Sequence, residues 1–189
     1  MPSRKPAARR LVIHTDGAAR GNPGPAGAGF VVETADGRLI QEGSVYLGER
    51  TNNQAEYEAL LHALEAVAPD SETRLEVYSD SQLMVRQLTG EYRVKHEDLK
   101  GRHARATIYL GRASSASVRH VPRDGNERAD ELANRAIDVH LEASEGLDGQ
   151  TVAGGGSRES GSRRRKVRAP QGRTLAEAPP GANARHPSG

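Results

Sequence analysis

Four acidic residues in this chain of 189 residues stand at the ends or starts of predicted elements. Asp16 and Asp80 each follow a short apolar run, and Glu56 and Asp130 lie near the starts of two helical patterns. Crowded carboxylates repel one another unless cations neutralise them, and Mg²⁺ prefers oxygen ligands together with substrate phosphate oxygens. If these acids converge, they suit metal-assisted phosphodiester hydrolysis, with two ions about 3.5 to 4 Å apart flanking the bond that breaks.

Each of these acids also has an ordinary structural explanation. A single Asp or Glu at a strand end or in a first helical turn is most often a cap or a solvated charge. The chemistry therefore depends on whether the elements that carry the four acids bring them together.

Three strands are predicted before the first helix. Residues 10–15 form a strand-like run that ends at Asp16 in a turn-rich stretch. Residues 27–34 and 38–47 are two further strand-like runs, and Asp-Gly at 36–37 between them is a strong hairpin signal. We expect three consecutive antiparallel strands.

A helix and a parallel strand follow. From Asn52, apolar residues recur at spacings of three and four, which predicts a helix capped by Asn52 or Asn53 and stopped by Pro69. Residues 74–79 form the next strand, and a helical crossover of this kind makes it parallel to the first. Further predicted elements are a short helix capped by Asp80-Ser81 and ending near Leu88, a helix between His96 and Arg112, a strand at 117–121, a turn at 122–125 and a helix from Asn126 to about His140.

This order predicts an α/β fold with a mixed five-stranded sheet, its first three strands antiparallel, flanked by helices. The first and fourth strands can then be adjacent and parallel. In that arrangement Asp16 and Asp80 emerge side by side at the carboxyl edge of the sheet, where ligand sites in open α/β sheets tend to form.

Charge is divided unevenly along the chain. Residues 11–141 hold 15 Lys and Arg against 20 Asp and Glu, whereas residues 1–10 hold 4 against 0 and residues 142–189 hold 8 against 5. We predict a basic N-terminal extension at 1–9, one folded domain at 10–141 and a disordered Gly/Arg/Pro-rich tail at 142–189.

Composition narrows the class of protein further. The chain has no cysteine, so any metal must be held by oxygen or imidazole. It shows neither a signal-peptide pattern nor a membrane-length apolar segment, and we expect a cytoplasmic protein. No oligomerisation signal is visible, so a monomer is expected.

The sequences around the four acids resemble the ribonuclease H type 1 family, metal-dependent endonucleases that cut RNA paired with DNA. The resemblance rests on four motifs in the family's order and spans about residues 11 to 138: T-D-G-A-A-R-G-N-P-G-P-A-G at 15–27, T-N-N-Q-A-E at 51–56, S-D-S-Q at 79–82 and N-E-R-A-D-E-L-A at 126–133. It implies a ribonuclease H-like fold in which Asp16, Glu56, Asp80 and Asp130 are the catalytic carboxylates and bind two Mg²⁺ ions, with Mn²⁺ as a substitute. The implied reaction hydrolyses the RNA strand of an RNA/DNA hybrid and leaves 3′-hydroxyl and 5′-phosphate ends.

The resemblance also implies a set of substrate-binding residues: Asn22, Thr51, Asn53 and Gln82. Amide side chains both donate and accept, so they can bond the ribose 2′-hydroxyl that distinguishes RNA from DNA. Purely structural roles stay open, since Asn53 could cap a helix, Asn22 could serve a turn and Gln82 could be solvated.

The loop before the last helix departs from the family pattern. Many members carry a histidine there, whereas this chain has none between Val121 and Asp130. We interpret His120 as structural, with a hydrogen-bond partner at the sheet end. Arg123 lies near the position of the missing histidine and could contact a substrate phosphate, but it cannot act as a base. The variant resembles archaeal members and ribonuclease H domains fused to phosphatases, some of which also cut RNA duplexes, so an RNA duplex stays open as a second substrate.

A second departure concerns basic residues that could grip nucleic acid. Larger relatives have a tryptophan-containing basic handle, and this chain has no tryptophan. Modest substitutes are Arg93, Lys95, Lys100, Arg102 and Arg105, although a solvated helix face explains them equally well. The tail adds a cluster at 163–168 that could raise the local concentration of nucleic acid, or be incidental.

Three other functions compete with this interpretation. A hybrid-binding module without catalysis does not explain why all four acids are present, because binding a polyanion is easier without them. A DNA nuclease or strand transferase of this fold also uses clustered metal-binding carboxylates, but the T-N-N-Q-A-E and N-P-G-P segments favour RNA recognition. A small-molecule phosphatase lacks a recognisable nucleophile or pocket.

Overall fold

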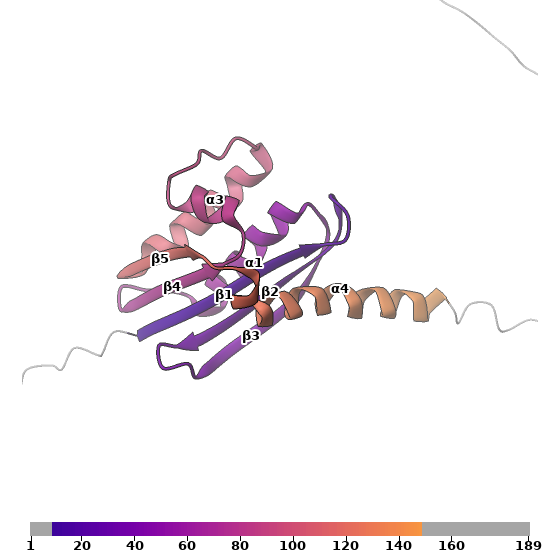
Figure 1. Cartoon of the computed structure of the whole chain (residues 1–189), viewed down its shortest axis with the longest axis horizontal. Helices are drawn as coiled ribbons and strands as arrows, with labels where there is room; N and C mark the ends of the chain where they lie inside the picture. Colours follow the sequence, from indigo (N-terminus) through magenta and orange to yellow (C-terminus); the bar gives the residue numbers. More distant parts are fainter. Residues whose placement is uncertain (1–8, 149–189) are drawn as a thin grey trace, which may run out of the picture. The chain divides into compact units, whose positions relative to one another are not determined.

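A computed structural model describes residues 9–148 of the chain, and Figure 1 shows how their helices and strands are arranged. The order of elements is the predicted one. They are β1 (Arg9–Ala19), β2 (Gly24–Thr34), β3 (Leu39–Arg50), α1 (Asn52–Val67), β4 (Thr73–Ser79), α2 (Gln82–Leu88), α3 (Glu97–Arg112), β5 (Ser115–His120), the 3-10 helix η1 (Arg123–Gly125) and α4 (Glu127–Asp148).

The strands form one mixed sheet in the order β3-β2-β1-β4-β5. β1 pairs antiparallel with β2 and β2 pairs antiparallel with β3, whereas β4 is parallel to both β1 and β5. The parallel ladder between β1 and β4 ends at the pair Thr15 and Ser79, so Asp16 and Asp80 follow neighbouring positions. The predicted sheet and its adjacent first and fourth strands are confirmed.

β1 is longer than predicted. It continues to Ala19, with Asp16 paired to Gly29 and Ala19 paired to Ala26, so the prediction that Asp16 ends the first strand is wrong. The turn-rich composition was misleading because β2 supplies backbone hydrogen-bond partners for these small residues on one side of the strand. Asp16 therefore lies inside a paired strand, just past the end of its parallel ladder.

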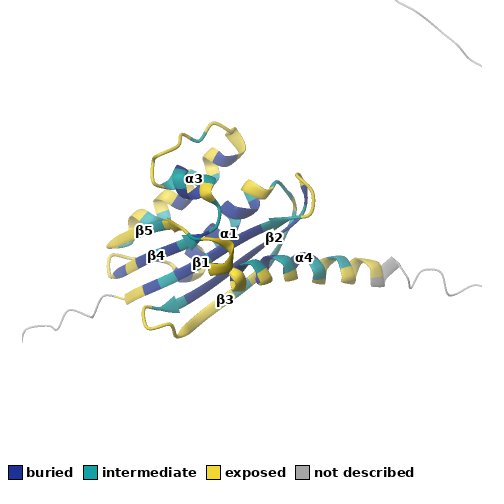
Figure 2. Ribbon diagram, in the orientation of Figure 1, coloured by how far each residue is buried: buried dark blue, intermediate teal, exposed yellow. Residues whose placement is uncertain are grey.

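The main hydrophobic core lies between the sheet and α1. Ile13 of β1, Val77 of β4 and Leu60 and Leu64 of α1 are fully buried there, and Figure 2 shows the dark blue, buried stretches along the central strands. The apolar residues that predicted α1 thus face the sheet. Their packing positions the start of this helix against β1.

α4 packs against β2 and β3 on the other face of the sheet. Two glycines of β2 allow this approach: a Cβ at Gly27 would lie 2.2 Å from the Ala133 carbonyl oxygen, and one at Gly29 would lie 2.0 Å from that of Ala129. Both distances are impossible for real side chains, so only glycine lets the helix backbone sit this close. This contact positions the first turn of α4, which carries Asp130.

Several element ends differ from the predictions. Thr51, and neither Asn52 nor Asn53, is the N-cap of α1, and Ser81 precedes α2 without a side-chain capping bond. β5 covers Ser115–His120 in place of 117–121. α4 runs to Asp148, past its predicted end near His140, so the predicted disorder is wrong for residues 142–148, and the rest of the predicted tail lies outside the described residues. No helix within residues 9–148 has the length and apolarity needed to cross a membrane.

Candidate active site

Three of the four predicted acids converge at the carboxyl edge of β1 and β4. Asp16 comes from β1, Glu56 from α1 and Asp80 from the residue after β4, and one carboxylate oxygen of each lies within 4.8 Å of the others. Asp16 and Glu56 are only 4% and 5% exposed, while Asp80 is partly buried. The parallel pairing of the two strands brings Asp16 and Asp80 together, and α1 supplies Glu56.

Gly17 brings Glu56 into this cluster. A Cβ at position 17 would lie 2.2 Å from the Ala55 carbonyl carbon, so the start of α1 can approach β1 only because this residue is glycine. The Gly17 backbone N–H then donates to Oε2 of Glu56 at 3.2 Å. The Asp-Gly pair therefore has two roles, one carboxylate in the cluster and one backbone donor that orients another.

Burial and mutual repulsion disfavour the charged forms of these acids. Burial, followed by the neighbouring Asp80 carboxylate, raises the pKa of Asp16 from 3.8 to about 8. Burial, followed by the charges of Asp16 and Asp80, raises the pKa of Glu56 well above its usual value. A divalent cation would relieve both effects, and three converging oxygen donors fit the ligand preference of Mg²⁺. The residues therefore fit a metal site.

Asp130 lies beside the cluster but outside it. It is half-buried in the first turn of α4, and its Oδ1 accepts a hydrogen bond from Nη2 of Arg123 at 2.5 Å. The Asp130 charge still contributes to the raised pKa of Asp16, so the two carboxylates are near enough to interact. The structure thus brings three of the four predicted acids together and pairs the fourth with an arginine.

Arg123 lies in η1 with an exposed side chain that faces the acids. Its charge lowers the pKa of both Asp16 and Glu56, opposing the effect of burial. It is therefore a cation at the rim of the cluster, in reach of Asp130 and open to solvent. This position fits the predicted contact with a substrate phosphate.

The other predicted substrate residues gather at the starts of α1 and α2. Oδ1 of Asn22 accepts from the Asn52 backbone N–H at 3.0 Å, which ties the loop after β1 to α1. Thr51 forms a capping box with Gln54, and Asn53 is exposed in the same first turn of α1. Thr51 therefore has a structural role that the sequence analysis assigned to asparagine. Separately, the exposed side chain of Gln82 opens α2, two residues after Asp80.

Asn126 is a residue that the sequence analysis did not single out for the site. It is 2% exposed, and its Nδ2 donates to the Thr15 carbonyl oxygen at 2.9 Å and to Oδ1 of Asp80 at 3.3 Å. Its own Oδ1 is buried and has no hydrogen-bond partner among the described residues. The side chain links β1, the end of β4 and the start of α4. Its place in the N-E-R-A-D motif, four residues before Asp130, was the signal that could have found it.

The structure does not support the interpretation of His120 or the suggested basic handle. His120 is exposed at the end of β5, and its side chain finds no hydrogen-bond partner within residues 9–148, so the interpretation as a satisfied structural histidine is wrong. Of the suggested handle residues, Lys100 pairs with Glu97, Arg102 with Glu58 and Arg105 with Glu65. Two of these ion pairs join α3 to α1, so Arg102 and Arg105 have structural partners, and the alternative of an ordinary helix surface is favoured over a handle.

Comparisons with known proteins agree with this geometry. The family model described as reverse transcriptase-like matches residues 14–136. Ribonuclease HI of Halobacterium salinarum is 47% identical over 129 residues, covering 68% of this chain and 65% of the relative. A bifunctional protein of Mycobacterium tuberculosis is 39% identical over 136 residues, covering 71% of this chain and 37% of the relative. The chain spans less than two thirds of the length of these curated relatives.

A solved structure extends the comparison to three dimensions. LC11-RNase H1, crystallised in complex with RNA/DNA hybrid, is 46% identical and aligns with a TM-score of 0.66, covering 69% of this chain and 99% of that chain. The matched region, residues 14–136 in the family model, contains the residues of the carboxylate cluster. The chain belongs to the ribonuclease H type 1 family.

Proposed function

We propose that this chain is a metal-dependent endonuclease that hydrolyses the RNA strand of RNA/DNA hybrids. The convergence of Asp16, Glu56 and Asp80 within 4.8 Å at the sheet edge carries the proposal. Such a cluster is costly in the absence of cations and has no evident structural purpose. The similarity to LC11-RNase H1, a protein solved with an RNA/DNA hybrid, supports the hybrid as substrate.

The residues that would hold the metal are Asp16, Glu56, Asp80 and Asp130, and the proposal includes two Mg²⁺ ions per site with Mn²⁺ as a substitute. When bound, the ions supply an activated water and neutralise charge on the leaving oxygen. The proposed products carry 3′-hydroxyl and 5′-phosphate ends.

The chain's own residues orient this site. The Gly17 N–H fixes one oxygen of Glu56, and Asn126 fixes one oxygen of Asp80. Arg123 holds Asp130 beside the cluster. When a substrate phosphate arrives, the exposed Arg123 guanidinium can pair with it, because planar guanidinium groups bind phosphate well. The Asp130 carboxylate is then released toward the other three.

Recognition of the RNA strand is proposed for Asn22, Asn53 and Gln82, whose amides can bond 2′-hydroxyl groups. Thr51 contributes by holding the turn that presents Asn53. The proposal treats the protein as a monomer whose catalytic domain is residues 10–141 with α4 extending to Asp148, and it keeps RNA duplex as a second substrate.

The basic cluster at 163–168 is proposed to strengthen binding through its charge. The full chain should then have a lower KM for hybrid at low salt than a chain ending at Asp148. Equal KM values would contradict this role of the tail.

The direct test uses end-labelled RNA/DNA hybrid, RNA duplex, DNA duplex and single-stranded RNA of one sequence, with Mg²⁺, Mn²⁺ or EDTA. We expect metal-dependent cutting of the hybrid's RNA strand, which is abolished in Asp80→Asn. Asp124→Asn is the matched control, because Asp124 is an exposed acid of η1 outside the cluster. Hybrid that is bound but never cut with either metal would instead indicate a binding module.

A further inference from the structure

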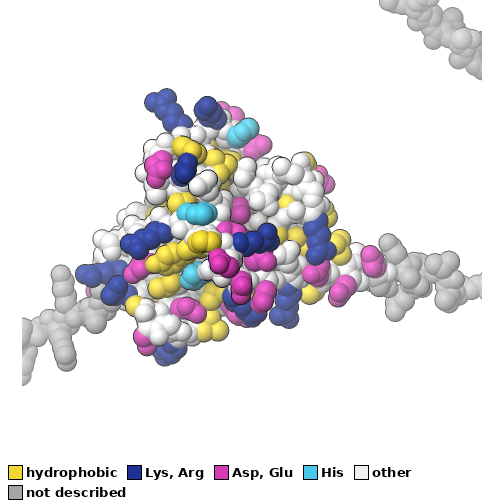
Figure 3. All heavy atoms as spheres, in the orientation of Figure 1, with side chains coloured by type: hydrophobic (Ala, Val, Ile, Leu, Met, Phe, Trp, Pro, Cys, Tyr) yellow, Lys and Arg dark blue, Asp and Glu magenta, His cyan; other side chains and the backbone are white. Residues whose placement is uncertain are grey.

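Beyond the carboxylate site, the open face of the sheet carries a group of arginines. α4 covers one face of the sheet at β2 and β3. On the same face, β4 and β5 carry side chains that reach solvent, and we call this uncovered part the open face. Arg10, Arg74 and Arg119, all exposed, line one hollow of about 440 Å³ on this face. Figure 3 shows dark blue Lys and Arg side chains over β4 and β5, in the same view as Figure 1.

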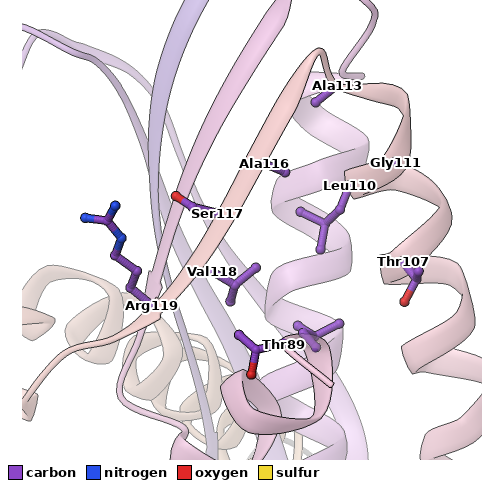
Figure 4. Close-up of a pocket in the computed structure, with 10 residues that line it drawn as sticks. Thr89, Thr107, Leu110, Gly111, Ala113, Ala116, Ser117, Val118 and Arg119 are labelled. Atoms are coloured by element: carbon purple, nitrogen blue, oxygen red, sulfur yellow. The ribbon is translucent and has the colours of Figure 1, made fainter. Parts of the chain in front are cut away.

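The register explains why three arginines from three strands meet. Arg10 of β1 is paired with Arg74 of β4, and Arg119 of β5 is paired with Tyr78, four residues after Arg74. Paired residues and residues an even number apart share a face of a sheet. Figure 4 agrees, since Arg119 leaves β5 on the side opposite Val118, which lines a separate pocket together with Leu110 of α3.

The hollow is positive although the folded domain is acidic. Residues 11–141 have five more acids than bases, yet the hollow contains three arginines and a single carboxylate, Glu76. Glu76 already accepts from Arg10 at 3.1 Å and from the Tyr78 hydroxyl at 3.2 Å. Within residues 9–148, neither Arg74 nor Arg119 forms an ion pair. Two guanidinium forks can therefore receive an anion.

The arginines lie along a line that leads away from the carboxylates. Arg119 is paired with Tyr78, which lies two residues before Asp80. Arg10 lies six residues before Asp16 on β1, which is parallel to β4. At about 3.3 Å per residue, Arg10 is roughly 20 Å from the acids. A strand that stays stacked as in a duplex rises about 3.4 Å per nucleotide and covers this distance in roughly six nucleotides.

We propose that this hollow binds the phosphates of a single-stranded extension of the nucleic acid held at the carboxylate site. The inference rests on the proposed function, because that site supplies the anchored duplex from which the extension leaves. Arg119 meets the extension first, and Arg74 and Arg10 meet it further along. Ser115 and Ser117, which also line the hollow, add hydroxyl donors for phosphate oxygens. An ordinary solvated sheet face would show no dependence on the length of an extension.

The first measurement is binding of a fluorescent 12-nucleotide single strand, as DNA and as RNA, to the full chain at low salt. We expect Arg74→Gln/Arg119→Gln to weaken binding at least about threefold, because removing a cation from a phosphate lowers both the affinity and its salt dependence. The control is Arg38→Gln/Arg135→Gln, which removes the same charge from exposed positions away from the hollow. Both proteins keep the C-terminal arginines, so the tail contributes equally. Equal affinities for the two double variants would overturn the proposal.

The second measurement separates this inference from the proposed function. The two double variants are assayed on hybrids that carry a single-stranded extension of 0, 3, 6 or 12 nucleotides at one strand end, with each end tested in turn. We expect kcat and the blunt-end KM to be the same, and KM for one extended end to rise in Arg74→Gln/Arg119→Gln, with a plateau near six nucleotides. Identical KM values at all lengths would overturn this inference alone, whereas uncut blunt hybrid would contradict the proposed function. Thermal melts confirm that both variants fold, since exposed substitutions rarely change stability by more than about 0.5 kcal/mol.

Discussion

Asp130 and the three clustered acids belong to one set of motifs but have different surroundings. Asp16 and Asp80 come from neighbouring parallel strands and Glu56 reaches them from the buried face of α1, so strand pairing and burial hold the three clustered acids near one another. Asp130 lies on a helix, is half-buried and already has a cation partner in Arg123. Under the proposed function, the three clustered acids form the metal site, and Asp130 joins them when Arg123 pairs with a substrate phosphate.

Loss of one of the three clustered acids should have the largest effect on kcat. We expect Asp80→Asn to lower kcat on hybrid at least about 100-fold, because the variant lacks a metal ligand. Asp130→Asn should cost only about tenfold, since the three clustered carboxylates Asp16, Glu56 and Asp80 stay in place. Both values come from kcat at saturating Mg²⁺. Equal losses in the two variants would remove the distinction between the acids.

Asn126 should behave as a positioning residue for Asp80 in the cluster of three acids. Asn126→Ala leaves Asp80 without its amide donor, and we expect kcat to fall about tenfold, with more Mg²⁺ needed for half-maximal rate. Asn126→Asp places another charge at the cluster and should require still more Mg²⁺. A melting temperature lowered in Asn126→Ala with unchanged Mg²⁺ dependence would indicate a merely structural role.

The raised pKa of Asp16 predicts how stability depends on pH when no divalent ion is bound. Its pKa is about 8 in the folded protein against 3.8 ordinarily. The folded state therefore keeps a proton that the unfolded state loses, and stability falls as pH rises from about 4 to about 8. Asp16→Asn should remove this penalty and stabilise the metal-free protein at pH 8 by on the order of 1 kcal/mol, with little change at pH 4. Melts in EDTA that are no higher for the variant at pH 8 would contradict the repulsion described for the cluster.

Arg123 should give the smallest effect. Arg123→Gln should raise KM for hybrid about threefold and reduce the salt slope of binding by about one, as expected when one cation no longer meets a phosphate. Arg123→Lys should recover part of this effect, because the charge returns without the planar fork. The matched control is Arg38→Gln, and a KM change shared by this control would show a general charge effect.

The sequence was most informative where a motif and a strand order constrained the same residue. The two apolar runs before Asp16 and Asp80, joined by a helical crossover, were enough to predict adjacent parallel strands and two neighbouring carboxylates. Gly17 within the Asp-Gly pair explains in retrospect why Glu56 could reach them, but the close approach of α1 is visible only in three dimensions.

Other features depended on partners distant in the chain. β1 extends to Ala19 because β2 pairs with it, which the local turn-like composition concealed. The bonds of Asn126 to Thr15 and Asp80 join residues 111 and 46 positions apart, so the local motif could mark Asn126 but not its partners. The pairing of Arg123 with Asp130 spans only seven residues, but it depends on the angle at which η1 leads into α4.

The most direct test of the metal site is proton release on metal binding. Mn²⁺ is titrated calorimetrically into metal-free protein at pH 7 in two buffers of different ionisation enthalpy. Because the pKa of Asp16 lies near 8 and that of Glu56 is also raised, metal binding should release about one proton or more, and the release should shrink above pH 9 and in Asp16→Asn. No binding, or binding with no proton release at pH 7, would contradict the proposal that these buried carboxylates form a metal centre.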